Sequence, residues 1–237
     1  MNSLTTTPAP ASHERVRGRL VLLAGGTSAS GRACALALVE AGARVVIVGS
    51  NADRLAASGA SAPGAATEQC DLADPDAVAA LRARVHDAHG PVDGVVHLVG
   101  GWRGGGGLAG QSDEDLAALL RSFTALRNVS RTFDDDLRSS DAGRLAIVSS
   151  TAVARPLAGG ANYAAVKAAS EAWTRAAAQG YAKHARDGGR ALSAAGVIFR
   201  VRSLDGLEHA LASAVVALWD DDAAAWNDVV IEIEAGG

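Results

Sequence analysis

Three residues in the second half of the chain have the chemistry and spacing to move a proton to or from a bound oxygen atom. Tyr163 and Lys167 are four residues apart in an alanine-rich stretch that predicts a helix, so their side chains lie one turn apart on one face. Ser150 comes thirteen residues before Tyr163, directly after an apolar run that predicts a strand. A phenol has a pKa of about 10, and a neighbouring ammonium lowers it by favouring the phenolate. We therefore expect Tyr163 to exchange a proton with a substrate oxygen that Ser150 holds by a hydrogen bond.

A glycine-rich segment at residues 24–31 follows the first apolar run and precedes a predicted helix. A phosphate-binding turn needs small residues at this position, because the backbone must approach a pyrophosphate and the helix must point free N–H groups at it. Gly25 permits the tight turn, Gly31 permits close packing of the helix on the strand, and Ala29 stands between them. The segment predicts a nucleotide site with contacts from Gly25, Thr27, Ser28, Ala29, Ser30 and Gly31.

The turn after the second predicted strand distinguishes between two nicotinamide cofactors. An acid at this position binds the ribose 2′-hydroxyl of NAD, but the turn holds none, and Asp53 comes later, where it caps a helix. Ser50, Asn51 and Arg54 instead offer donors for a 2′-phosphate. The sequence therefore favours NADP(H) over NAD(H) as the cofactor.

The elements that must position these residues alternate between short apolar runs and alanine-rich stretches from Leu20 onward. This alternation of strand and helix predicts a parallel sheet that is buried on both faces. We expect strands at residues 20–24, 44–48, 65–70, 92–99, 144–149, 191–195 and 228–232. We expect helices at 31–41, 53–58, 74–89, 163–185 and 207–219, and either one long helix or two at 113–137. The fold class is thus α/β, with a single doubly wound Rossmann-type parallel sheet of about seven strands and helices on both faces. One domain at residues 18–237 follows a flexible tail at residues 1–17.

The composition excludes several classes of protein. The 237 residues are 49% hydrophobic, which is enough apolar surface to exclude a disordered chain. No apolar run reaches the roughly 18 residues of a membrane span, and a net charge of −4 argues against a nucleic-acid surface. Cys34 and Cys70 form neither a disulfide framework nor a four-ligand zinc site. We therefore expect no metal, no nucleic-acid partner and no membrane partner, and a cytoplasmic location.

The glycine turn and the Ser–Tyr–Lys set together resemble the short-chain dehydrogenase/reductase family, whose turn is T-G-x-x-x-G-x-G and whose catalytic set is S…Y-x-x-x-K. The resemblance runs from Leu20 to Lys183. It implies an NAD(P)-dependent oxidoreductase that reduces a small-molecule carbonyl or oxidises the alcohol by hydride transfer, and a homodimer or homotetramer built on the long helices. On the family's pattern, Tyr163 and Lys167 also contact the cofactor, and further cofactor contacts come from Asp71, Leu72, Val99 and Gly100.

Several positions depart from the family's pattern. Ala24 and Ala29 replace a threonine and a glycine of the turn, and residues 97–100 replace N-N-A-G and keep only its glycine. Ser122 stands where the family carries a catalytic asparagine, and we expect it to act in that place by holding a water molecule. Residues 194–196 stand near the family's P-G pair, about ten residues before the last long helix, which leaves room for almost no substrate lid.

Two alternative functions follow from these departures. Residues 100–107 hold six glycines and place Trp102 where it would cover a nicotinamide or a flat substrate. Their G-G-W-x-G-G sequence resembles the dihydropteridine reductase branch of the family, which adds a pteridine-type reductase. The changes at Ala29 and Ser122 and the missing lid add a catalytically impaired, nucleotide-binding regulatory or scaffold protein. We expect His97 to pack within its strand rather than to act in catalysis.

Overall fold

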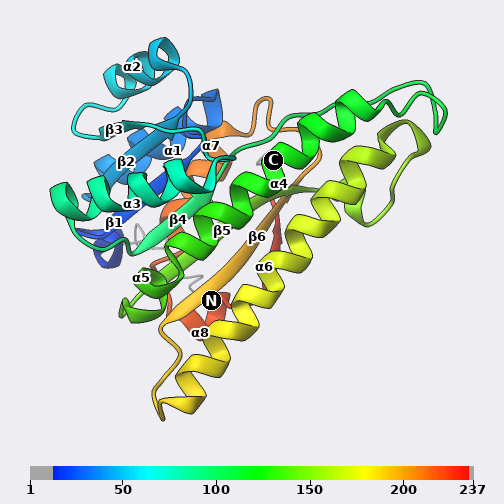
Figure 1. Cartoon of the computed structure of the whole chain (residues 1–237). Coiled ribbons are helices and arrows are strands. Elements are labelled where there is room, and N and C mark those ends of the chain that lie inside the picture. Colours follow the sequence, from blue (N-terminus) through cyan, green and yellow to red (C-terminus); the bar gives the residue numbers. More distant parts are fainter. Residues whose placement is uncertain (1–12, 235–237) are drawn as a thin grey trace, which may run out of the picture.

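Within residues 13–234, which the computed structural model describes, seven parallel strands form a sheet at the centre of the protein (Figure 1). The strands are β1 (Leu20–Ala24), β2 (Arg44–Gly49), β3 (Ala66–Gln69), β4 (Gly94–His97), β5 (Gly143–Ser150), β6 (Ala194–Val201) and β7 (Val229–Glu232). The helices are α1 (Ala29–Glu40), α2 (Ala52–Ser61), α3 (Pro75–His89), α4 (Asp113–Thr132), α5 (Asp134–Ser139), α6 (Ala161–Asp187), α7 (Glu208–Ala217) and α8 (Ala223–Trp226). Three short 3-10 helices are η1 (His13–Val16), η2 (Thr151–Val153) and η3 (Ala158–Gly160). This architecture confirms the predicted α/β fold class.

The strand order, β3-β2-β1-β4-β5-β6-β7, contains one reversal of direction. The chain builds outward from β1 to β3, crosses back, and then builds from β4 to β7 on the other side. β1 and β4 are therefore neighbours, with Ala24 paired to His97 at their carboxyl ends. In open α/β sheets, ligands bind outside the carboxyl ends of the strands at such a reversal. This geometry places the candidate site at the ends of β1, β4 and β5.

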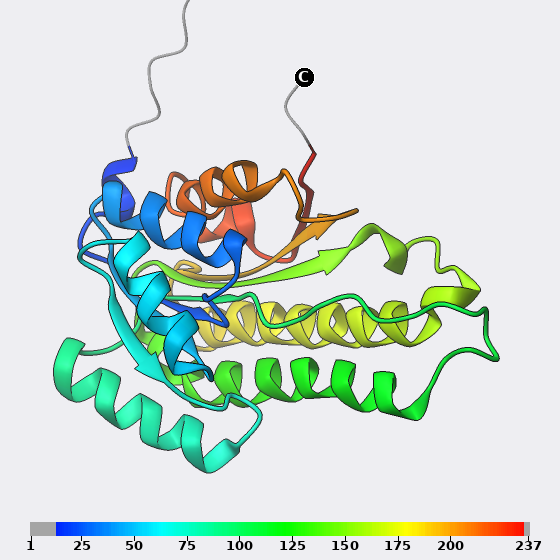
Figure 2. The ribbon, with the colours of Figure 1, turned by 90° about the horizontal axis from the view of Figure 1, so that it is seen from above.

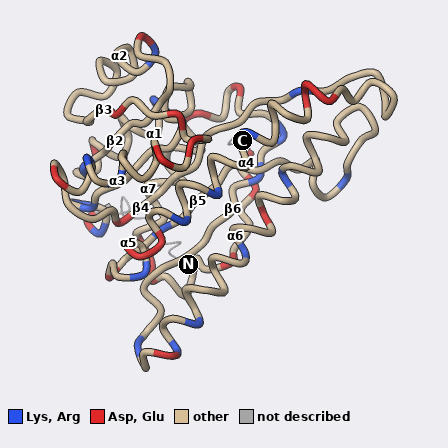
Figure 3. The backbone as a smooth tube through the Cα atoms, in the orientation of Figure 1, with Lys and Arg blue, Asp and Glu red and all other residues tan. Residues whose placement is uncertain are grey.

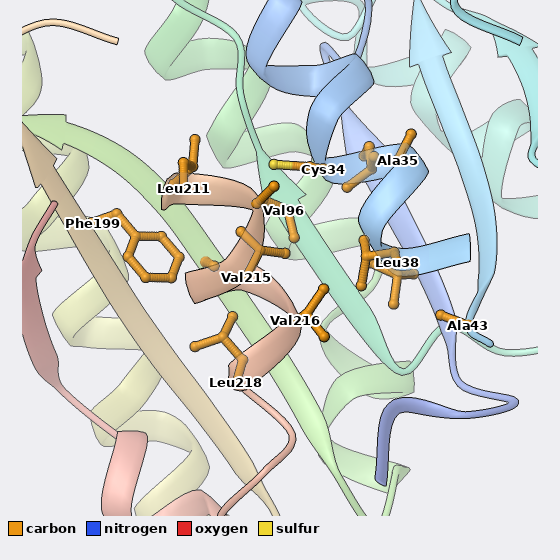
Figure 4. Close-up of a cluster of buried hydrophobic side chains, with 14 of the residues drawn as sticks. Cys34, Ala35, Leu38, Ala43, Val96, Phe199, Leu211, Val215, Val216 and Leu218 are labelled. Carbon is orange, nitrogen blue, oxygen red and sulfur yellow. The ribbon is translucent and has the colours of Figure 1, made fainter. Parts of the chain in front are cut away.

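Alternate side chains of the strands build hydrophobic cores on both faces of the sheet. On β1, Val21 belongs to one core and Leu22 to the other. Helices α1 and α7 cover the first core, where Leu38 and Val216 lie near Val96 of β4 (Figure 4). Helices α3, α4 and α6 cover the other face, and Figure 2 shows the two helical layers from above. The sheet is thus buried on both faces, which fixes the position of its strand ends.

β6 departs most from the predicted elements. We expected this strand at residues 191–195, but it spans Ala194–Val201, because its alanine-rich start masked the apolar run that follows. Its last residue pairs with Ser150, the last residue of β5. Residues 194–196 therefore begin the strand, and their alignment with the family's P-G pair is wrong. Only residues 202–207 connect β6 to α7, so the segment where a lid would stand is shorter than expected.

Two other predicted boundaries change. The helix expected at residues 113–137 is divided at Phe133 into α4 and α5, as one of the two alternatives allowed. Residues 13–17 belong to the folded domain rather than to the tail, because η1 buries Val16 completely in the core. The rest of the expected tail, residues 1–12, lies outside the described residues.

Charged residues lie mainly along the helices and loops, where both signs are interspersed in the view of Figure 3. The helices resolved between residues 13 and 234 include none that is long and apolar enough to cross a membrane.

Candidate active site

The glycine turn between β1 and α1 has a shape that only small residues permit. Gly25 has a φ of +82°, and a Cβ there would lie 2.7 Å from a methyl carbon of Val99. A Cβ on Gly31 would clash with the carbonyl oxygen of Gly26. α1 begins at Ala29, so the alanine that replaces the family's middle glycine has ordinary helical backbone and carries no strain. Side chains at positions 25 and 31 would fill the space inside the turn. Glycine keeps this cradle open, as a phosphate site requires.

Two guanidinium groups meet at the back of this turn. Ser28 caps α1, and its Oγ accepts the N–H of Gly31 at 3.1 Å. The carbonyl oxygen of Thr27 accepts hydrogen bonds from Arg32 at 3.0 Å and from Arg54 at 3.4 Å. Positive charge therefore lies beside the N-terminus of α1, where the helix dipole also favours an anion.

A cavity of about 710 Å³ opens at the strand ends beside the turn. Of the predicted cofactor residues, its lining includes Gly25, Thr27, Ser28, Ser50, Arg54, Asp71, Leu72, Val99 and Gly100. Residues 29–31 are not part of this wall, since they form the first turn of α1 behind it. Asn51 is not part of it either, because its Oδ1 caps α2 and accepts the N–H of Arg54 at 2.9 Å. The structure thus brings together most of these residues but uses Asn51 to begin a helix.

Asp71 and Leu72 are held at the cavity by α4. The carboxylate of Asp71 accepts the N–H of Ala73 at 3.0 Å and two hydrogen bonds from Arg121 at 2.9 and 3.2 Å. These contacts, that of Ala73 first, lower the pKa of Asp71. Asn128 donates to the carbonyl of Leu72 at 3.1 Å. Asp71 is therefore ionised and paired at neutral pH.

A second cavity, of about 940 Å³, continues from the first along the ends of β5 and β6. Ser150, Tyr163 and Lys167 line it. The two cavities share the residues Leu98, Val99, Gly100, Gly101 and Trp102. Trp102 is 66% exposed and stands where the cavities meet. The structure therefore brings the three predicted proton-transfer residues together, next to the space beside the glycine turn.

Ser150 and Tyr163 come from two elements that converge at the strand end. Ser150 is the last residue of β5, and Tyr163 is in the first turn of α6. Ser150 Oγ accepts the N–H of Ala152 at 3.1 Å. Burial raises the pKa of Tyr163, and the neighbouring Ser150 hydroxyl offsets part of this rise. Tyr163 therefore keeps its proton at neutral pH.

Lys167 is held by the backbone rather than by the phenol. Its Nζ donates to the carbonyl of Val148 at 2.7 Å and lies 5.8 Å from the centre of the Tyr163 ring. Burial lowers the pKa of Lys167 to about 8, against the opposing effect of the Glu171 carboxylate one turn later. We expected this ammonium to lower the pKa of Tyr163. That expectation is wrong for the structure described, because burial of the phenol dominates.

Ser122 and His97 meet beneath the cavities. Ser122 lines the first cavity but not the second, and its hydroxyl donates to the carbonyl of Leu119 within α4 at 2.6 Å. His97 is buried near the backbone of Ser122, and its Nδ1 has no partner among the described residues. Burial, and then the charge of Lys167, lower the pKa of His97 to about 3. His97 is packed within the fold, as expected, and a water held by Ser122 stays a prediction.

The glycine-rich loop between β4 and α4 lies beside the loop between β5 and α6 (Figures 1 and 2). Gln111 joins them, because its Nε2 donates to the carbonyls of Gly105 and Gly159, both at 3.0 Å. Its Oε1 accepts the N–H of Asn162 at 3.1 Å. Asn162 directly precedes Tyr163 in the first turn of α6. One side chain thus fixes both loops at the start of the helix that carries Tyr163.

Three residues of this region are absent from the sequence-based predictions: Gln111, Arg155 and Arg202. The two arginines line the second cavity, after the ends of β5 and β6. The position after a strand end would have identified Arg202, had β6 been placed correctly. No sequence signal identifies Gln111, because its partners are backbone groups of distant segments.

A family model described as short chain dehydrogenase matches residues 19–185 of the chain. A 3β-hydroxysteroid dehydrogenase from Mediterraneibacter gnavus is 32% identical over 173 residues, which are 69% of this chain and 61% of that protein. The chain spans less than two thirds of the length of the curated relatives it matches.

Solved structures share the fold over nearly the whole chain. NAD⁺-bound xylitol dehydrogenase matches with a TM-score of 0.81 at 18% identity, over 93% of this chain and 99% of its own. A metagenomic short-chain oxidoreductase in complex with NADP matches with a TM-score of 0.79 at 25% identity, over 94% and 100%. At 18% identity, the likeness to xylitol dehydrogenase concerns the fold alone.

Proposed function

This chain belongs to the short-chain dehydrogenase family, and we propose that it is an NAD(P)-dependent oxidoreductase that reduces a small-molecule carbonyl, or oxidises the corresponding alcohol. The observation that carries the proposal is the convergence of Ser150, Tyr163 and Lys167 in a cavity that continues into the one beside the glycine turn. Family membership supports the class of reaction, and this geometry supports the residues.

The cradle at Gly25 and Gly31 fits a dinucleotide, because it leaves backbone N–H groups open at a helix N-terminus. We assign the pyrophosphate to this turn, with Ser28 beside it, and the ribose next to the nicotinamide to Gly100 and Lys167. The nicotinamide, when bound, supplies or accepts the hydride.

The protein's own residues handle the substrate oxygen and its proton. Ser150 donates a hydrogen bond to the carbonyl oxygen and so stabilises the negative charge that develops on it. Tyr163, which burial keeps protonated, donates its proton to that oxygen as the carbonyl is reduced. Lys167, charged at pH values below its pKa of about 8, stabilises the phenolate that remains. The raised pKa of Tyr163 keeps this proton available for reduction at neutral pH.

The charges around the first cavity support NADP(H) over NAD(H). Ser50 and Arg54 line the cavity after β2, and no acid among the described residues lines that part of it. The acid elsewhere on its wall, Asp71, is already paired with Arg121. A 2′-phosphate therefore finds a donor and a guanidinium without a competing carboxylate.

Each of the two alternative functions has one structural observation in its favour. Exposure of Trp102 on both cavities favours a flat substrate, and a pteridine-type reductase would oxidise NAD(P)H with a quinonoid dihydropterin. The bond of the Ser122 hydroxyl within its own helix favours an impaired, nucleotide-binding regulatory protein. Such a protein would bind the cofactor but turn over none of a broad panel of aldehydes, ketones and dihydropterins.

Tyr163→Phe tests the proposed role of the phenol. We expect turnover of an active carbonyl to fall by at least about 100-fold, because the proton donor is lost, and NADPH affinity to stay within about twofold. The matched control is Tyr181→Phe, since the Tyr181 hydroxyl is buried in the core without a partner among residues 13–234. Unchanged turnover in Tyr163→Phe would rule out the proposed site.

A further inference from the structure

Two arginines without an acidic partner lie on the wall of the cavity that holds Ser150 and Tyr163. Arg155 and Arg202 line this cavity, and neither forms an ion pair or a hydrogen bond with any residue between 13 and 234. Most arginines near the first cavity differ in this respect: Arg121 is paired with Asp71, for example. The two guanidinium groups are therefore free to bind a ligand.

Both arginines follow the carboxyl ends of neighbouring strands, β5 and β6, and Ser150 is the last residue of β5. The last residues of β5 and β6, Ser150 and Val201, pair in register. Arg202 directly follows Val201, and Arg155 follows Ser150 after the short helix η2. Both charges thus stand at the end of the sheet where the substrate oxygen would be held.

The rest of the wall combines apolar surface with little negative charge. Leu157 and Trp102 are 78% and 66% exposed, and Leu204 also lines the cavity. Asp205 is the one acid on this wall within the described residues, and it forms no ion pair with either arginine. The cavity thus offers two unpaired guanidiniums and the Lys167 ammonium against one carboxylate, beside an apolar rim.

We propose that the substrate carries a carboxylate on an apolar body, and that Arg155 and Arg202 hold this carboxylate while Ser150 and Tyr163 act on its carbonyl. The inference rests on the proposed function. A guanidinium presents a planar fork of donors that matches a carboxylate in two parallel hydrogen bonds, so a carboxylate gains more here than a neutral group of the same size. The apolar rim accepts the hydrocarbon or aromatic part.

The direct test compares benzoate with benzamide, which differ in charge but hardly in shape. Binding to the protein, alone and saturated with NADP⁺, is measured by ligand-observed NMR, so turnover is not needed. We expect benzoate to bind at least about tenfold more tightly than benzamide, and Arg155→Gln/Arg202→Gln to remove this preference. The control is Arg186→Gln, which removes an exposed charge near the far end of α6 and should change neither affinity.

The NADPH affinity of the same variants shows whether the arginines bind the substrate carboxylate or the cofactor phosphates. If the arginines hold the substrate, the double variant keeps NADPH affinity within about twofold of the wild type. If they hold the cofactor phosphates instead, NADPH affinity falls with benzoate affinity, and the proposal is overturned. Equal binding of benzoate and benzamide by the wild type overturns it as well.

Turnover distinguishes this inference from the proposed function. A panel of keto acids and their methyl esters is assayed with NADPH. If the wild type prefers the keto acids to their methyl esters and the double variant loses this preference, both proposals are supported. Equal turnover of acids and esters keeps the reductase and overturns the carboxylate site. Absence of NADPH binding overturns the proposed function, whereas the benzoate comparison still decides whether the anion site exists.

Discussion

Burial acts in opposite directions on the two titratable groups of the site. It raises the pKa of the Tyr163 phenol and lowers the pKa of the Lys167 ammonium, because it disfavours the charged form of each. At neutral pH, the pair therefore consists of a neutral phenol and a charged amine rather than a phenolate and an ammonium. A proton for the substrate oxygen is in place before the reaction begins.

His97 makes stability sensitive to pH. Its pKa is about 3 in the folded protein and about 6.5 when unfolded, so the unfolded chain binds a proton that the folded chain excludes. Stability contributed by neutral His97 is present above about pH 6.5 and falls with pH through the window down to about 3, by roughly 1 kcal/mol per pH unit. His97→Leu should flatten this decline in urea unfolding between pH 4 and pH 6.5, about the range that the shift covers. His209→Leu, on the exposed side of α7, is the control, and parallel curves for wild type and His97→Leu would contradict the account.

The sequence predicts the roles of side chains that depend on spacing along the chain. It does not predict roles that depend on which groups lie nearby in the folded structure. The i,i+4 spacing of Tyr163 and Lys167 placed both on one face of α6. The carboxamide of Asn51 was assigned to the cofactor, but its own helix uses it as a cap. Arg155 was not identified, because it lies in a loop whose course depends on Gln111 and on backbone contacts.

At the scale of elements, Gln111 connects the segments that form the second cavity. Gln111→Ala removes the bonds to both loops and to the first turn of α6. We expect kcat for an active substrate to fall about tenfold, because misplacement of the phenol is costly, while NADPH affinity stays within about twofold. Steady-state kinetics together with calorimetry of cofactor binding separate these two effects.

Gln111→Glu tests which half of the amide matters. It keeps an acceptor for Asn162 but loses the donor to Gly105 and Gly159, so it should restore little of the lost rate. The matched control is Gln69→Ala, which removes a bond to the Ser50 carbonyl at the other cavity and should leave kcat unchanged. Full activity of Gln111→Ala would show that the two loops hold their shape without it.

The strongly apolar strand β1 could be placed from the sequence, whereas β6, with its alanine-rich start, could not. β1 matches its predicted bounds at Leu20–Ala24 because every residue is apolar and buried on both faces. β6 was misplaced because alanine and glycine carry little strand preference, although pairing with β5 fixes it in the structure. Because the strand was expected to end at residue 195, the sequence did not identify Arg202 as a residue that follows a strand end.

At the scale of the whole molecule, the reversal between β1 and β4 lies in the middle of a row of six strand ends, β1 to β6, whose residues line the two cavities. The alternating pattern of the sequence was sufficient to predict this sheet, since each crossover helix returns the chain to the same edge. The short connection at residues 202–207 contributes residues 202–205 to the wall of the second cavity. A homodimer or homotetramer built on the long helices stays a prediction.

The most direct test of the account is calorimetric titration of the full chain with NADPH and, separately, with NADH. The cradle at Gly25 and the guanidiniums of Arg32 and Arg54 beside Thr27 predict binding of both, with NADPH at least about tenfold tighter, or roughly 1.4 kcal/mol. Tighter binding of NADH would contradict the assigned cofactor. Binding of neither would contradict the central claim that this edge of the sheet is a nicotinamide site.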